Sequence, residues 1–290
     1  MTALTIQATR ERVDIFRPGH RNPMLVQHAK ADTRAYIHPI VAPDGNGQLT
    51  EDTPSHHPWQ HGLYVGLNEV NGVGFWTEGL LAGREDTDGT FHPGPIANAT
   101  AHDHTATWTV TSDWRDPSGA LILTETQAWT LTDQGATYDI DLAWSLTAAL
   151  DIRFAAYAYG GLFLRMPYRK DGEGEAINNN GQVNTEAEGQ RAKWVSVSVP
   201  IEGRDDWAGI AIMDHPDNPE HPTPWRVDGQ LGIAPSRCIA GPWTLSKGET
   251  TTSNYRLLAF CGPTDPPRIH GNWSRFAQCR PAQSYDMDVD

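Results

Sequence analysis

Two loops rich in histidine, proline and tryptophan carry the residues best suited to chemistry. They are residues 56–62, which read HHPWQHG, and residues 214–225, which read DHPDNPEHPTPW. Imidazole can transfer a proton near neutral pH or bind a metal ion, while proline fixes the backbone and tryptophan offers a flat apolar wall. We expect both loops to meet in one cleft, where the imidazoles exchange protons with a ligand. The predicted catalytic residues are His57, His61, His215 and His221.

A strand predicted over residues 151–167 is expected to present a binding face. Side chains alternate along a strand, so one face is apolar and the other carries Arg153, Tyr157, Tyr159, Phe163 and Arg165. Guanidinium groups bind carboxylate or hydroxyl pairs beside such rings; on an ordinary outer face, arginine stems would instead cover the tyrosines. Arg153 and Arg165 would lie about 40 Å apart on a straight strand. We therefore expect either a bend at Gly160-Gly161 or a ligand held by Arg165 alone.

The neighbouring predicted strand, residues 121–131, directs Glu125, Gln127 and Trp129 inward if its threonines face solvent. A buried carboxylate is costly unless it is paired. We expect Glu125 either to form a structural ion pair, for instance with Arg153 or Arg165, or to act as a general base. The full set of predicted ligand-binding residues is Arg165, Arg153, Tyr157, Glu125, Trp129, Asn218, Trp225 and Trp59.

Three blocks of the sequence, in order, resemble the PmoA-like family of bacterial proteins. The blocks are residues 34–39 (RAYIHP) with 44–45 and 57–76, then residues 159–165, then residues 209–225. The resemblance implies a galactose-mutarotase-like β-sandwich, a scaffold that usually handles carbohydrates, while the family label implies a methane oxygenase subunit. Many members continue the first loop as His-Pro-His-His-Arg-Gly, whereas this chain has HPWQHG. We therefore expect no metal ion and no other cofactor.

Composition makes several classes of partner unfavourable. The chain of 290 residues has a formal net charge of −14, which makes nucleic acid and anionic membrane surfaces poor partners. It has no apolar run of transmembrane length and no charged-then-apolar secretory start. Its three cysteines lack metal-ligand spacing, which predicts a reducing, cytoplasmic location. The sequence leaves the oligomeric state open.

Short runs of alternating apolar and polar residues, separated by glycine, proline and aspartate, predict strands almost throughout. Their number and hairpin spacing predict an all-β protein, a large antiparallel two-sheet β-sandwich of the galactose-mutarotase-like supersandwich kind. We expect residues 1–278 to form a single domain and residues 279–290 a loosely held tail. The segment 170–190, rich in glycine and asparagine, predicts a long loop that is either a functional lid or a disordered excursion.

These observations together predict a carbohydrate-active protein whose partner is a small-molecule carbohydrate. The expected chemistry is acid/base catalysis on a sugar or an oxidised sugar: epimerisation, β-elimination or glycoside cleavage. Each of these reactions needs one proton removed and another delivered, which imidazoles can do. A non-catalytic sugar-binding or regulatory module would use the same aromatic face. A metal-dependent oxidase, as the family label suggests, is the third alternative.

Overall fold

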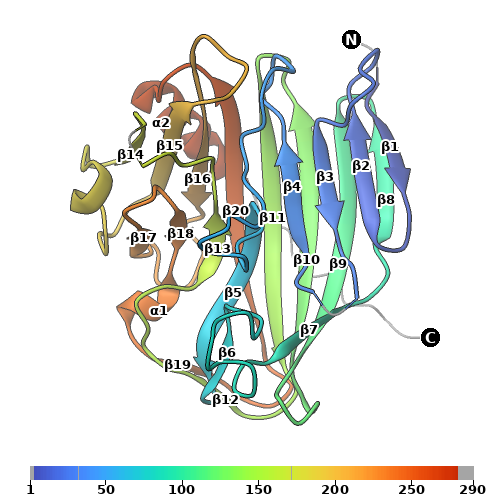
Figure 1. The fold of residues 1–290 in the computed structure, drawn as a ribbon, viewed down its shortest axis with the longest axis vertical. Helices are drawn as coiled ribbons and strands as arrows, with labels where there is room; N and C mark the ends of the chain where they lie inside the picture. The colour runs from blue at the N-terminus through green and yellow to red at the C-terminus, as the bar shows by residue number, and fades with distance from the viewer. Residues whose placement is uncertain (1–2, 32, 171, 280–290) are drawn as a thin grey trace.

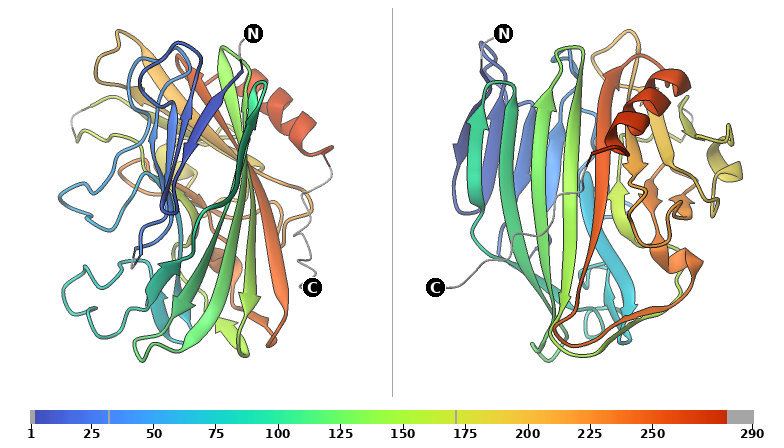
Figure 2. Two further views of the ribbon diagram at one scale, coloured as in Figure 1. Left: turned by 90° about the vertical axis from the view of Figure 1, so that its right-hand side faces the viewer. Right: turned by 180° about the vertical axis from the view of Figure 1, so that it is seen from behind.

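Two antiparallel β-sheets stacked face to face form the body of the molecule (Figure 1). The computed structural model describes residues 3–31, 33–170 and 172–279. Figure 2 shows the two layers edge-on in its left view. The prediction of an all-β, two-sheet antiparallel sandwich is therefore confirmed.

The first sheet has eleven strands within the described residues. Eight of them follow one another across the sheet: β1 (Thr5–Ala8), β2 (Arg12–Phe16), β3 (Leu25–His28), β4 (Tyr36–Ile40), β5 (Leu63–Val70), β13 (Gly161–Leu164), β18 (Ile233–Pro235) and β17 (Trp225–Val227). Three short strands extend the sheet near β5 at the bottom of Figure 1: β6 (Val73–Phe75), β12 (Ile152–Phe154) and β19 (Trp243–Leu245).

The second sheet has nine strands in the part of the chain that the structure describes. In order across the sheet they are β14 (Glu175–Asn178), β15 (Trp194–Pro200), β16 (Trp207–Asp214), β20 (Thr250–Cys261), β11 (Thr137–Ala148), β10 (Leu121–Asp133), β9 (Thr105–Arg115) and β7 (Thr90–Pro93), with β8 (Ala97–His102) also paired to β9. The helical elements are the short α1 (Arg237–Ala240), α2 (Pro266–Phe276) and a 3-10 turn, η1 (Asn184–Glu186).

The core between the sheets is built by side chains that alternate along the long strands. On β10, Glu125, Gln127 and Trp129 are buried, while Thr126 and Ala128 between them are half-exposed. Trp129 stacks on Trp108 of β9 with ring centroids 6.1 Å apart. The predicted inward direction of these three residues is confirmed, because β10 keeps one register with β9 from Leu123 to Thr132, beyond the irregularity at its start.

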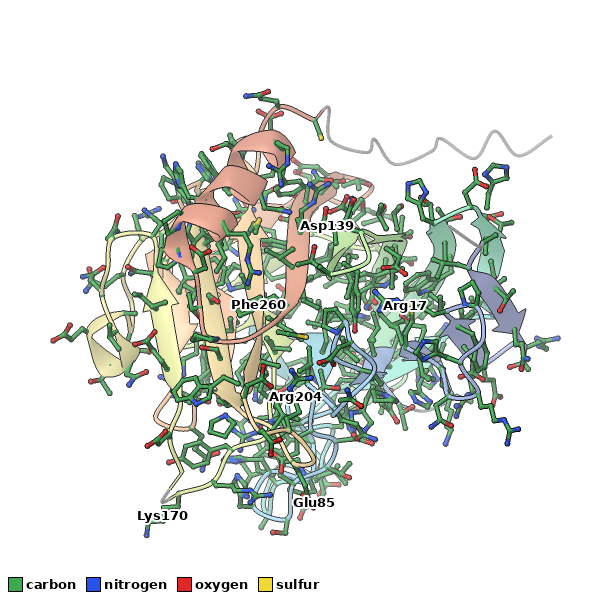
Figure 3. The ribbon with its side chains drawn as sticks, turned by 90° about the horizontal axis from the view of Figure 1, so that it is seen from above. Arg17, Glu85, Asp139, Lys170, Arg204 and Phe260 are labelled. Carbon is green, nitrogen blue, oxygen red and sulfur yellow. The ribbon has the colours of Figure 1, made fainter. Side chains whose placement is uncertain are left out.

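Helix α2 covers part of the outer face of the second sheet, as the view from behind shows (Figure 2). Asp265 caps its first turn by accepting a hydrogen bond from the backbone N–H of Arg268, and proline occupies the first helical position. Ile269 and Phe276 on the helix pack in one cluster with Phe260 of β20. Phe260 lies on the side of the sheet beneath the helix (Figure 3).

The predicted strand over residues 151–167 is two short strands instead, β12 and β13. The backbone between them passes through Gly160 and Gly161, whose φ angles are +149° and +110°, a region that favours glycine. A Cβ on Gly161 would lie 2.3 Å from the carbonyl oxygen of Pro235, so the close approach of β18 also requires glycine. Ala156 and Ala158, which alternation places on the apolar face of the predicted strand, are exposed. The sharp bend expected as one alternative is present, so that Arg153 lies on β12 and Arg165 directly follows β13.

The segment 170–190 is not a single structureless loop in the part described. It contains β14, which pairs with β15 at the edge of the second sheet, and η1. The side chain of Asn178 accepts hydrogen bonds from the backbone N–H groups of Asn180 and Gln182, which closes the turn after β14. The predicted loose tail falls on residues that, apart from Cys279, lie outside the described residues.

Candidate functional site

The face of the first sheet that points away from the second sheet carries an aromatic cluster. Alternation places Tyr64 of β5 and Phe163 of β13 on this face, whereas the residues on either side of them lie in the core. Trp76 packs against both rings, at centroid distances of 5.5 Å and 5.3 Å. Gly66 makes room for this contact, because a Cβ there would lie 3.1 Å from the Trp76 ring. The first histidine loop reaches the cluster through Trp59.

A chain of four charged side chains, here called the ion chain, lies beside the aromatic cluster. His61 lies between two carboxylates: its Nδ1 is 2.8 Å from Asp52 Oδ1, and its Nε2 is 3.3 Å from Glu78 Oε2. Glu78 Oε2 also lies 2.9 Å from Arg34 Nε, and Glu78 Oε1 accepts a hydrogen bond from the Arg34 backbone. Both ring nitrogens of His61 are therefore occupied. This arrangement suits a fixed imidazolium rather than a free proton carrier.

The ion chain holds its members in their charged forms. Burial alone would lower the pKa of His61, but its hydrogen bonds to Asp52 and Glu78 outweigh burial and raise that pKa. Burial also opposes the charge of Glu78, yet Arg34 and His61 together lower the pKa of Glu78 to about 2. For Asp52 the hydrogen bond from His61 likewise outweighs burial and lowers its pKa. The two carboxylates thus remain anionic at neutral pH, as partners for His61 and Arg34.

A pocket of about 130 Å³ opens beside the aromatic cluster, and we call it the aromatic pocket. Its apolar walls include three rings, and its polar groups are an imidazole, a guanidinium and a carboxylate. These residues are Trp59, Trp76, Tyr159, His57, Arg226 and Asp228. Small-molecule sites commonly combine apolar walls with a few placed polar groups. The pocket has this composition.

His57 is the residue in the aromatic pocket best able to move a proton. Its Nδ1 is buried and has no hydrogen-bond partner among the described residues, and its ring lies edge-on to Trp59 at 5.2 Å. Burial lowers the pKa of His57, and the nearby His56 and Arg165 lower it further, while Asp228 opposes them. The imidazole is therefore neutral at pH 7, the form that a general base requires.

Two charged side chains from β17 and the turn that follows it line the same pocket. Asp228 Oδ1 accepts hydrogen bonds from the backbone N–H groups of Gln230 and Gly232, at 2.8 Å and 2.9 Å. These bonds fix the position of the carboxylate. Arg226 donates to Glu188 Oε1 at 2.6 Å. Both groups are thereby oriented before any ligand arrives, which lowers the entropy lost on binding.

Residues 50–52, in the segment before the first histidine loop, line a larger groove of about 880 Å³. His38 lies in the same wall, and burial lowers its pKa. Arg204 joins the two segments that border the groove, since its NH1 donates to Asp44 Oδ1 at 2.6 Å. Figure 3 shows Arg204 where these segments meet. Residues 50–62 therefore border both this groove and the aromatic pocket.

The second histidine loop packs on the other sheet, contrary to the predicted convergence. His215 lies edge-on to Phe276 at 5.0 Å, and His221 stacks parallel to Trp273 at 6.4 Å. Both aromatic residues belong to α2, which covers the outer face of the second sheet. The first loop instead packs on the outer face of the first sheet. The expectation of one shared cleft was wrong, because similar loop composition does not determine which sheet a loop covers.

Asp214, at the end of β16, organises the second loop. Its buried carboxylate accepts hydrogen bonds from Asn218 Nδ2 and His221 Nδ1, both at 2.8 Å. The backbone N–H of Thr223 donates a third bond and the Thr223 hydroxyl a fourth, both at 3.0 Å. A buried carboxylate needs such partners. His221 thus stabilises the loop through its hydrogen bond to Asp214.

We expect replacement of His221 by alanine to lower the free energy of unfolding by about 1–3 kcal/mol, because a buried acceptor loses one of its donors. His102, whose side chain is 90% exposed, provides a matched histidine control that should change stability by less than about 0.5 kcal/mol. Urea denaturation of both variants measures the difference. Equal stabilities would contradict this structural role.

Glu125 lies in the core rather than in either hollow. It accepts hydrogen bonds from Trp114 Nε1 at 3.1 Å, Trp144 Nε1 at 2.7 Å and Gln127 Nε2 at 3.0 Å. The expected ion pair with an arginine of the 151–167 segment is not formed, since these N–H donors satisfy the carboxylate. Burial raises the pKa of Glu125. It is separated from the aromatic pocket by the first sheet.

Four other predicted ligand-binding residues also lie away from the aromatic pocket. Trp129 and Trp225 are in the core between the sheets. Asn218 is buried in the second loop, where it bonds to Asp214. Arg153 is exposed on β12. These residues were predicted from their residue types and from alternation along the predicted strands, and the fold places them apart from one another.

Three predicted ligand-binding residues do gather at the first loop. Trp59 lines the aromatic pocket, and Tyr157 lies edge-on to Tyr159 of the pocket wall at 4.9 Å. Arg165 lies beneath the loop, where its NH2 donates to His56 Nε2 at 3.1 Å. With His57 and His61 they form the part of the predicted site that the structure brings together.

Sequence reasoning missed the partners of these residues. Arg34, Asp52 and Glu78 of the ion chain are far apart in the sequence and have no shared spacing. A signal was available for Arg226 and Asp228, because alternation in a strand turns them to the face opposite the buried Trp225. Ion pairs between distant segments leave no such periodic trace.

Among the described residues, no three side chains of histidine, cysteine, aspartate or glutamate are grouped so as to hold a metal ion. Within that same part of the chain, no helix combines the length and the apolar character needed to cross a membrane.

Comparison with known families gives one broad match. The model of a family of unknown function, DUF6807, matches residues 15–274. The description of this family does not carry the PmoA label that the sequence resemblance suggested. No curated protein shows significant sequence similarity to the chain.

Several solved structures resemble the chain at low identity. A GH36 alpha-galactosidase from Geobacillus stearothermophilus is 9% identical with a TM-score of 0.42, over 89% of this chain and 40% of that one. A galactose mutarotase related enzyme from Lactobacillus acidophilus is 10% identical with a TM-score of 0.36, over 88% of this chain and 97% of that one. An alpha-galactosidase from Lactobacillus brevis is 11% identical with a TM-score of 0.37, over 88% and 39%. The chain thus spans about two fifths of these galactosidases.

Proposed function

The chain belongs to the family of unknown function DUF6807, and we propose that it acts on a sugar or an oxidised sugar by acid/base chemistry in the aromatic pocket. One observation carries this proposal. The buried Nδ1 of His57 has no hydrogen-bond partner among the described residues, and His57 lines a pocket with aromatic walls. A buried polar atom left unpaired is costly. A ligand hydroxyl or an acidic C–H group would supply its partner.

The aromatic walls support a carbohydrate rather than a wholly apolar ligand. Trp59, Trp76 and Tyr159 offer flat surfaces against which the C–H faces of a sugar ring can pack. Arg226 and Asp228 in the same pocket can donate to and accept from hydroxyl groups. A ligand with both apolar faces and several hydroxyls matches this lining.

The groups in the pocket favour a reaction that begins when one base removes a C–H proton from the ligand. In β-elimination the protonated base then gives this proton to the leaving group, and in epimerisation water supplies a proton to the opposite face of the same carbon. Neutral His57 takes the proton, and the nearby Asp228 carboxylate stabilises the imidazolium that forms. Glycoside cleavage commonly uses two carboxylates across the scissile bond, whereas Asp228 is the single carboxylate in the described lining. We therefore place epimerisation and β-elimination ahead of glycoside cleavage.

His61 takes a different part in this proposal from the one predicted. Its two ring nitrogens are held by Asp52 and Glu78, so it supports the first loop and does not exchange protons with the ligand. His215 and His221 hold the second loop instead. The predicted set of four catalytic histidines reduces to His57.

We expect replacement of Trp59 by alanine to raise the Kd for the bound sugar about tenfold, roughly 1.4 kcal/mol, because a stacking surface is lost. Trp273, another half-buried tryptophan, lies on α2 and serves as the matched control. Titration calorimetry with a panel of hexoses, hexuronic acids and aldonic acids measures both variants. Equal affinities for the Trp59 variant and the wild type would remove the aromatic pocket as the site.

A sugar-binding module without catalysis is the second candidate, because the aromatic walls alone would serve it. It predicts the same effect of Trp59→Ala but no chemical change in the ligand. We also propose a reducing, cytoplasmic location, since Cys238, Cys261 and Cys279 are all free thiols. No metal ion has a part in this proposal.

A further inference from the structure

Arg165 is a buried cation that does not line the aromatic pocket. It follows β13 on the outer face of the first sheet, and its side chain is fully buried beneath the first histidine loop. Its backbone N–H donates to the carbonyl of Gly62 at 2.6 Å, and its carbonyl accepts from the N–H of Glu51 at 3.0 Å. The backbone of Arg165 thus fixes both ends of residues 51–62, the first histidine loop together with the segment that leads into it.

The guanidinium of Arg165 binds the loop a second time through its side chains. Nε donates to Glu51 Oε2 at 3.2 Å, and NH2 donates to His56 Nε2 at 3.1 Å. NH1 donates to the carbonyl of Gln230 at 3.5 Å, in the turn between β17 and β18. This turn also carries Asp228, which lines the aromatic pocket. One planar fork therefore connects the loop to the turn on the far side of the pocket.

We infer that Arg165 is a positioning residue, which fixes His57 against the aromatic pocket and does not itself bind the sugar. The inference rests on the proposed function of that pocket. His57 is the direct neighbour of His56, the residue that the fork holds. Lysine could keep the charge but could not reproduce three bonds in a fixed planar arrangement. The geometry of the fork is therefore needed in addition to its charge.

The charge of Arg165 also reaches His57. The charged and titratable groups facing His57 are His56 on its own loop, Arg165 at the end of β13, and Arg226 and Asp228 from β17 and its turn. Arg165 and His56 lower the pKa of His57, after the larger effect of burial, and Asp228 opposes them. Removing the cation should raise the pKa of His57.

The test uses the full chain with Arg165→Lys, Arg165→Gln and, as the matched control, Arg153→Gln at an exposed arginine. Hydrogen exchange measures the amides of residues 53–60, and NMR titration measures the pKa of His57. We expect exchange in the loop to become at least about tenfold faster in both Arg165 variants, because the bonds from the guanidinium to Glu51, His56 and Gln230 are lost. We expect the pKa of His57 to rise in Arg165→Gln, and no change in Arg153→Gln.

A milder variant keeps the test valid if the buried substitutions prevent folding. Glu51→Gln leaves Arg165 in place and weakens one arm of the fork, since Glu51 is partly exposed. We expect faster exchange in the same loop with the fold intact. Unchanged exchange in Arg165→Lys and Glu51→Gln, or an unchanged His57 titration in a folded Arg165→Gln variant, would overturn the inference.

Sugar binding separates this inference from the proposed function. If Arg165 held the ligand directly, Arg165→Lys would weaken sugar binding while loop exchange stayed as in the wild type, which would also overturn the inference. If the wild type binds no sugar of the panel but the loop and His57 respond as expected, the proposed function fails and the positioning role stands. The two failures therefore give different results.

Discussion

Replacement of His57 by asparagine is expected to lower the rate of sugar turnover by about 10²–10⁴-fold, the usual contribution of a positioned acid/base group. Asparagine keeps polar atoms in the pocket but cannot take up a proton. The free energy of unfolding should stay within about 1 kcal/mol of the wild type, because the Nδ1 of His57 makes no hydrogen bond with the described residues. Rate measurements and urea denaturation on the same samples test both parts.

The pH dependence of the rate gives this prediction a direction. A general base acts in its neutral form, and burial, with His56 and Arg165, lowers the pKa of His57. The rate should therefore rise with pH to a plateau, with a midpoint below the ordinary histidine value of about 6.5. His102→Asn, at an exposed position, serves as control and should follow the wild-type profile. A rate that falls as pH rises through this range would mean that the protonated form acts.

Replacement of Glu78 by glutamine is expected to lower the free energy of unfolding by about 3–5 kcal/mol, the cost of breaking a buried ion pair on one side. Arg34 is 1% exposed and would lose its carboxylate partner, and His61 would lose one of its two. The exposed pair Arg169–Glu202 provides the control, and Glu202→Gln should cost less than about 1 kcal/mol. Similar losses in both variants would contradict a special role for the ion chain.

The stabilising effect of the ion chain should depend on pH in two opposite ways. The pKa of Glu78 is lowered from 4.5 to about 2, so its contribution is complete above pH 4.5 and is lost as pH falls toward 2. The pKa of His61 is raised above 6.5, so its contribution is complete below pH 6.5 and is lost as pH rises through the folded-state pKa. The difference in unfolding free energy between wild type and Glu78→Gln should therefore be largest between about pH 4.5 and 6.5. A difference that stays constant from pH 3 to 9 would contradict this account.

Local patterns in the sequence predicted the parts of the fold that repeat over many residues. The alternation through Glu125, Gln127 and Trp129 gave the correct faces of β10 because the strand keeps one register from Leu123 to Thr132. Alternation did not hold over residues 151–167, because the chain leaves the sheet after β12 and re-enters it only at Gly161, the first residue of β13. The alternation of side chains between two faces holds only within one continuous strand.

The candidate site was predicted in part, for a similar reason. His57, Trp59 and His61 lie in one short loop, so their proximity follows from the sequence. Their partners Glu78 and Asp228 come from other segments, and no spacing connects them to the loop. The second histidine loop was misplaced because its composition matches the first. The position of the second loop depends on α2, because His215 packs against Phe276 and His221 stacks on Trp273.

In the proposed reaction, neutral His57 removes a proton from a sugar bound in the aromatic pocket. The most direct measurement is proton NMR in D₂O of hexoses, hexuronic acids and aldonic acids incubated with the wild type, with His57→Asn and with Trp59→Ala. We expect that, with the wild type, one class of sugar loses a C–H signal to deuterium or forms an unsaturated product. The reaction should slow about 10²–10⁴-fold with His57→Asn, and it should also be slower with Trp59→Ala. Binding of a sugar by the wild type without any exchange or product, or exchange that persists unchanged in His57→Asn, would contradict the proposed reaction.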